Sequence, residues 1–194
     1  RGGPRTFDRD QAVETAMRLF WRYGYEGVSL NDLTREIGVA PPSLYSAFGS
    51  KAGLYREALD RYGALPGALD GMTDAAGPRQ AVEGLFREAI RAALASADER
   101  GCMVSSGMTE SSPANTSLSR EMAQRRDGIR EGIERALHRR LAADLARPLA
   151  GYLSAVLQGM AVQARDRATR EQPEAPARHA AAAVLVARAD HAGP

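Results

Sequence analysis

Residues 28–62 constrain the fold more than any other stretch, because they hold two short helical patterns joined by a tight turn and followed by a third. Ser29 is placed to cap the first helix, with Asp32 three residues later as its capping-box partner. Gly38 supplies the left-handed backbone that a sharp turn between two helices needs. Pro41 suits the first turn of the second helix, where amide hydrogens have no intrahelical partner. The stretch therefore predicts a helix-turn-helix.

The second of these helices, residues 41–48, has the pattern of a recognition helix. Leu44 and Phe48 are four residues apart and should face the core together. The side chains on its other faces carry short hydroxyls and a phenol, which can reach base edges or phosphate oxygens. They are Ser43, Tyr45 and Ser46. A half-buried packing role is the alternative for Tyr45.

A third helix should begin directly after this one. Ser50 can cap it, and Lys51 falls in its first turn beside free backbone amides, where a phosphate is held well. A simple solvated position is the competing interpretation for Lys51. The helix should continue to residue 62 and lead out of the amino-terminal region.

These residues carry a resemblance to a known family. Phe20, Gly24, Tyr25, the helix at 29–38, the L-Y-x-x-F pattern at 44–48 and Ser50-Lys51 resemble the amino-terminal domain of TetR-family transcriptional regulators. The resemblance covers roughly the first third of the chain, and a looser one extends to the R-G-C-M-V-S-S-G-M-T-E segment and to residues 157–164. It implies an all-α protein with a three-helix helix-turn-helix DNA-binding domain at 1–62 and a helical ligand-binding and dimerisation domain at 63–194.

The chain departs from the family pattern where the recognition helix opens. Ala40, Pro41 and Pro42 stand where the family usually has a polar cap and often a basic or polar residue. Direct base reading would then rest on the hydroxyl-bearing residues that follow, helped by an amino-terminal arm with a minor-groove or backbone contact. The expected DNA-contacting residues are Arg5, Ser29, Pro41, Ser43, Tyr45, Ser46 and Lys51.

Apolar residues at three- and four-residue intervals predict helices along most of the chain. Besides those above, we expect helices at 8–24, 78–97, 102–110, 118–142, 149–164 and 177–189, a Gly- and Pro-rich linker at 63–78, a loop at 143–148, and a break at Pro173 and Pro176. The last two helices combine small residues with apolar faces, which a symmetric four-helix dimer interface needs. The resemblance implies the same homodimer, with two recognition helices about 34 Å apart on an inverted-repeat operator in double-stranded DNA.

Apolar and polarizable side chains in the second region suit a small, mostly apolar effector. The candidate ligand-binding residues are Phe86, Ile90, Cys102, Met103, Ser106, Met122, Tyr152, Val156 and Met160. A place in the hydrophobic core is the alternative for each of them. Cys102 could sense an electrophile or oxidant if amides of a short helix favoured its thiolate, and a buried inert thiol is the alternative.

Other functions find little support. The three histidines lie far apart in the sequence, and no nucleophile motif, phosphate-binding loop or metal-ligand spacing is present, so we expect no enzyme, cofactor or metal site. The net charge is only +2, so the DNA prediction depends on the motif. One cysteine, no membrane-length apolar run and no signal-peptide core predict a cytoplasmic protein. We expect a ligand-released repressor; the alternative is a helical ligand or thiol sensor that has lost specific DNA reading.

Overall fold

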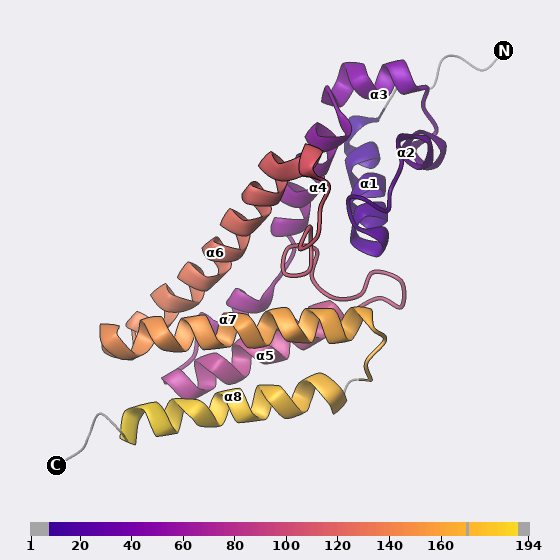
Figure 1. Cartoon of the computed structure of the whole chain (residues 1–194). Coiled ribbons are helices and arrows are strands. Elements are labelled where there is room, and N and C mark those ends of the chain that lie inside the picture. The colour runs from indigo at the N-terminus through magenta and orange to yellow at the C-terminus, as the bar shows by residue number, and fades with distance from the viewer. Residues whose placement is uncertain (1–7, 170, 190–194) are drawn as a thin grey trace.

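The computed structural model describes residues 8–169 and 171–189, and within these residues the regular structure is entirely helical (Figure 1). The expected all-α fold is confirmed. The helices are α1 (Arg9–Tyr23), α2 (Leu30–Ile37), α3 (Pro41–Phe48), α4 (Lys51–Gly63), α5 (Pro78–Ala93), α6 (Thr116–His138), α7 (Ala143–Arg165) and α8 (Glu171–Ala189), with short 3₁₀ turns η1 (Ala68–Met72) and η2 (Pro113–Asn115).

Local capping explains where the amino-terminal helices begin and end. The Asp8 carboxylate accepts hydrogen bonds from the amides of Asp10 and Gln11 and starts α1. Gly38 ends α2 with φ +78° in the left-handed region, and the Ser50 hydroxyl caps α4 by accepting from the amide of Gly53 at 3.0 Å. These boundaries agree with the sequence prediction.

The expected linker at 63–78 folds against α5 instead of standing apart from it. Its 3₁₀ turn η1 packs closely on α5, where Gly71 and Gly84 meet. A Cβ added at Gly84 would lie 1.9 Å from the carbonyl oxygen of Gly71, so only glycine allows this approach. The linker thereby becomes part of the wall of the second region.

The short helix expected at 102–110 is wrong: this segment is a series of turns. The carbonyl oxygens of Val104 and Gly107 accept hydrogen bonds from the Arg126 guanidinium at 3.4 and 2.8 Å, and Met108 has φ +50°, outside the helical range. Contacts with α6 therefore replace the hydrogen bonds of a regular helix here. Cys102 does not open a helix, although the amide of Ser105 donates a hydrogen bond to its sulfur at 3.4 Å.

Several boundaries differ in the second region, and one of them is the end of α5 at Ala93 instead of 97. Helix α6 ends at His138 instead of 142, and α7 begins at Ala143, where a loop was expected. Pro148 lies inside α7, and buried Ala146 and Leu149 on either side of it show that core packing compensates for the hydrogen bond that proline removes. Likewise, Pro173 and Pro176 do not break the chain, because both belong to α8.

The helices bury two hydrophobic cores. The first joins α1–α4 with residues from beyond position 100, among them Met103, Met108 and Met122. The second lies among α5, α6, α7 and α8 and includes Phe86 and Leu153. Figure 1 shows α1–α3 at one end, α5, α7 and α8 side by side at the other, and α4 and α6 running between them. Among the described residues, no helix has the length and apolar character needed to cross a membrane.

Candidate DNA-binding surface and effector cavity

The start of α2 is held by a complete capping box. The Ser29 hydroxyl accepts from the amide of Asp32 at 3.1 Å and donates to its carboxylate at 2.6 Å, while the amide of Ser29 donates to the same carboxylate. The Ser29 hydroxyl and amide hydrogen bonds, with help from Arg35, hold the pKa of Asp32 below its usual value. Ser29 therefore has a structural role at the start of α2, whatever it contacts on DNA.

Helix α3 presents the polar surface that its sequence predicts. Leu44 and Phe48 are buried, and the side chains that remain exposed are Pro41, Pro42, Ser43, Tyr45 and Ser46. Tyr45 is 45% exposed, so its phenol is available at the surface while part of the side chain is covered. The opening of α3 has no side-chain cap, as expected from Ala40.

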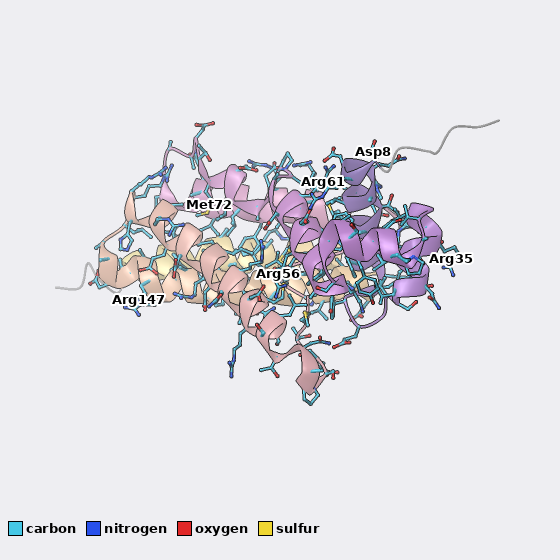
Figure 2. The ribbon with its side chains drawn as sticks, turned by 90° about the horizontal axis from the view of Figure 1, so that it is seen from above. Asp8, Arg35, Arg56, Arg61, Met72 and Arg147 are labelled. Carbon is cyan, nitrogen blue, oxygen red and sulfur yellow. The ribbon has the colours of Figure 1, made fainter. Side chains whose placement is uncertain are left out.

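Lys51 lies in the first turn of α4, as expected, and is partly buried instead of simply solvated. Its ammonium lies 4.1 Å from the centre of the Tyr25 ring, a cation–π contact. Burial lowers the pKa of Lys51, and the Glu26 carboxylate opposes that shift. Arg5 lies outside the described residues. Sequence reasoning missed Arg35, an exposed basic residue on α2, which Figure 2 shows at the outer edge of the α1–α3 end.

Replacing Tyr45 by phenylalanine removes a hydroxyl from this surface and leaves the ring. If the hydroxyl donates to a phosphate, we expect DNA affinity to fall about fivefold, equivalent to about 1 kcal/mol for one hydrogen bond, with little dependence on sequence. Fluorescence anisotropy with labelled duplexes measures this. Tyr23→Phe is the matched control, because Tyr23 is also exposed but ends α1 away from α3. Equal affinity of wild type and Tyr45→Phe would remove the phosphate assignment.

A cavity of about 640 Å³ lies where the amino-terminal helices meet the second region. The amino-terminal helices contribute Trp21, Leu59 and Tyr62, and the Trp21 and Tyr62 rings meet edge to face with centroids 4.8 Å apart. The remaining wall comes from the 65–70 stretch, the carboxyl end of α5, the turns near Cys102, and the facing sides of α6 and α7. Its volume is that of a site for a small organic molecule.

Three of the predicted ligand-binding residues line this cavity: Ile90, Cys102 and Met160. The other six lie elsewhere. Met103 and Met122 belong to the first core, Phe86 and Val156 pack in or against the second, Ser106 bonds to Arg165, and Tyr152 is exposed on α7. Sequence reasoning missed the contributions of Trp21, Tyr62 and the linker, since their spacing indicates only helix packing and a loop.

Polar groups on the cavity wall already have partners within the protein. The Trp21 indole donates to the carbonyl of Gly101 at 3.2 Å, the Asp70 carboxylate accepts from the amide of Gly67, and Arg125 pairs with Asp60. Burial raises the pKa of Tyr62 far above its usual value, with Cys102 as a further cause. With the charges paired and the wall mostly apolar, the cavity suits a neutral, largely apolar ligand.

The chain is similar to known bacterial transcriptional regulators. Residues 12–58 match the family model described as bacterial regulatory proteins, tetR family. The chain is 33% identical to the HTH-type transcriptional repressor ComR of Escherichia coli over 89% of this chain and 86% of ComR. It is 32% identical to the repressor BdcR of the same organism, over 88% and 86%.

A solved structure extends the similarity to the whole fold. A cysteine-substituted variant of the TetR-family regulator CifR, complexed with 26-bp double-strand operator DNA, superposes with a TM-score of 0.85 at 36% identity, covering 94% of this chain and 99% of CifR. Helix-turn-helix geometry, sequence identity over most of the chain and this structural similarity lead to one conclusion: the chain belongs to the TetR family of bacterial regulatory proteins and is a DNA-binding transcriptional regulator, not an enzyme.

Proposed function

We propose that the protein is a homodimeric cytoplasmic repressor that binds an inverted-repeat operator and releases it when a small, mostly apolar ligand fills the 640 Å³ cavity. The amino-terminal residues 1–62 act as the DNA-binding domain, and residues 63–194 bind the ligand and the second subunit. The names of ComR and BdcR as repressors and the operator complex of CifR support the DNA-binding part. The observation that carries the ligand part is that α1 and α4 form one wall of the cavity.

The dimer contact is proposed on the free face of α7. Tyr152, Ala155, Gly159 and Val162 are all exposed there at three- and four-residue intervals. Apart from α7 itself, no atom of the described residues lies within 4 Å of a Cβ added at Gly159, so another helix can approach closely. Together with α8, this face can complete a four-helix bundle with its symmetric copy.

Control by ligand follows from a difference in affinity between two dimer conformations. DNA favours the conformation in which the two α3 helices are about 34 Å apart. A ligand that binds more tightly to a differently spaced conformation lowers operator affinity in proportion to that preference. Because Trp21 and Tyr62 touch the cavity, a ligand there can bias α1 and α4 directly.

A neutral apolar fluorophore, N-phenyl-1-naphthylamine, tests the cavity. Trp21 is the single tryptophan of the chain and lines the cavity, so a bound probe should quench its emission by energy transfer. Ala93→Phe places a ring in the wall and should weaken probe binding about 5- to 150-fold, because overfilling costs about 1–3 kcal/mol. The control is Ala123→Phe on exposed α6, outside the cavity.

Candidate effectors are then screened on the protein bound to its selected duplex. Compounds that release DNA should also displace the probe, and Ala93→Phe should respond to them less. Compounds that release DNA without displacing the probe would place the effector elsewhere. A folded dimer that binds the probe but no specific duplex would favour the alternative, a ligand or thiol sensor with Cys102 on the cavity wall.

A further inference from the structure

The turns at residues 99–106, here called the clasp, are bonded to α1. The buried Glu99 carboxylate accepts a hydrogen bond from Arg22 on α1 at 2.6 Å and has Arg18 nearby at 3.8 Å. Burial raises the pKa of Glu99, but the Ser96 hydroxyl and Arg22 outweigh it and keep the pKa below its usual value, so this carboxylate is ionised. Gly101 adds a second bond by accepting from the Trp21 indole.

The same turns are bonded to the carboxyl end of α7. Arg100 donates to the carbonyl oxygen of Ala164 in the last turn of α7 at 2.9 Å, and to that of Ala168, just beyond the helix, at 2.7 Å. Gly101 packs so closely on this helix that an added Cβ would lie 2.6 Å from the carbonyl oxygen of Ala161. The clasp thus lies between α1 and α7 and is fixed to both.

Arg165 joins the three parts. From α7 it donates to the Ser106 hydroxyl of the clasp and to the backbone carbonyl of Trp21 on α1, each at 2.8 Å. Bonds from a guanidinium are about twice as strong as neutral ones, and these are partly shielded from water. Arg165 is therefore a direct link from α7 to α1 that bypasses α4.

The clasp also forms part of the cavity wall. Gly101, Cys102, Val104 and Ser105 line the cavity from the clasp, and Ala161 and Ala164 line it from α7. A ligand that presses on this wall therefore acts on the segment that fixes α1 to α7.

We propose that Arg165 and Glu99 are positioning residues for operator binding: through the clasp they hold α1 at a fixed distance from α7, and a ligand in the cavity releases DNA by loosening it. The proposal rests on the proposed function, in which α7 joins the two subunits. The position of each DNA-binding domain relative to the dimer axis is then set by two routes, one through α4 and one through the clasp.

The test compares Arg165→Met and Glu99→Gln with a matched control, Arg140→Met. Arg140 also donates to backbone carbonyls, those of Ala75 and Ala136, but has no contact with α1. Operator affinity should fall about tenfold in both clasp variants, within the range typical of coupling between sites, and stay unchanged in the control. Binding of N-phenyl-1-naphthylamine should tighten in the two clasp variants, because a ligand that loosens the clasp binds better when the clasp is already loose, and should stay unchanged in Arg140→Met.

Hydrogen exchange of the free protein gives a readout that needs no DNA. Amides at the carboxyl end of α1, residues 20–24, should exchange faster in Arg165→Met and Glu99→Gln than in wild type or Arg140→Met. The proposal would be overturned if both clasp variants had the exchange rates and the operator affinity of wild type. It would also be overturned if Arg140→Met lost as much operator affinity as they do. If wild type itself selects no duplex, the proposed function fails, and the exchange rates still decide whether the clasp holds α1.

Discussion

Replacing Gly159 by arginine should abolish operator binding without unfolding the chain. Gly159 is exposed on α7, so the single subunit can accommodate the side chain. In the proposed dimer the same guanidinium would be buried against the second subunit, and an unpaired buried charge costs several kcal/mol. Each monomer would then bind one half-site, and the lost avidity lowers affinity by a factor of about 10² to 10⁴.

Sedimentation velocity and fluorescence anisotropy measure the two consequences together. Ala123→Arg is the matched control, because Ala123 is exposed on α6, outside the proposed interface, and receives the same charge. It should remain dimeric and bind the operator normally. A Gly159→Arg protein that is still dimeric with full affinity would show that the subunits meet elsewhere.

Replacing Gly84 by alanine should produce the largest loss of stability. The added methyl carbon would lie 1.9 Å from the carbonyl oxygen and 2.8 Å from the carbonyl carbon of Gly71, and backbone atoms cannot give way as a flexible side chain can. Turn η1 must then separate from α5, at a cost of about 3 kcal/mol, the upper end for overpacking. For a chain of this size the Tm should fall by about 6 to 12 °C.

The control for this prediction is Gly128→Ala. Gly128 lies within α6, and no atom lies within 4 Å of an added Cβ, so alanine should stabilise the helix by about 1 kcal/mol. Differential scanning calorimetry compares the variants. Gly84→Ala should also weaken probe binding, since η1 supplies Ala68 and Leu69 to the cavity wall. Equal Tm values for Gly84→Ala and wild type would show that η1 does not need this close contact.

Features determined by neighbouring residues were predictable from the sequence. The capping box of Ser29 and Asp32, the turn at Gly38 and the exposed face of α3 all depend on contacts within a few positions. Features determined by distant contacts were not. The loop expected at 143–148 is helical and belongs to α7, while Pro173 falls in the first turn of α8, where proline is tolerated.

The cavity was only partly predictable for the same reason. Residues such as Ile90 and Met160 could be selected by chemical character, but Trp21 reaches the cavity because α1 packs beside α4 and the clasp. The linker reaches it because Gly71 and Gly84 allow η1 to lie against α5. No pattern of neighbouring residues in the sequence predicts either of these two packing contacts. The sequence therefore predicted the apolar character of the cavity wall better than the position of the cavity.

Selection of preferred duplexes from a random DNA pool, at near-physiological salt, tests the central claim most directly. The account predicts enrichment of an inverted repeat with half-sites about one helical turn apart, bound by a dimer. Affinity for the selected duplex should fall steeply as salt rises, since phosphate contacts release counterions. A folded, dimeric protein that enriches no sequence would contradict the account.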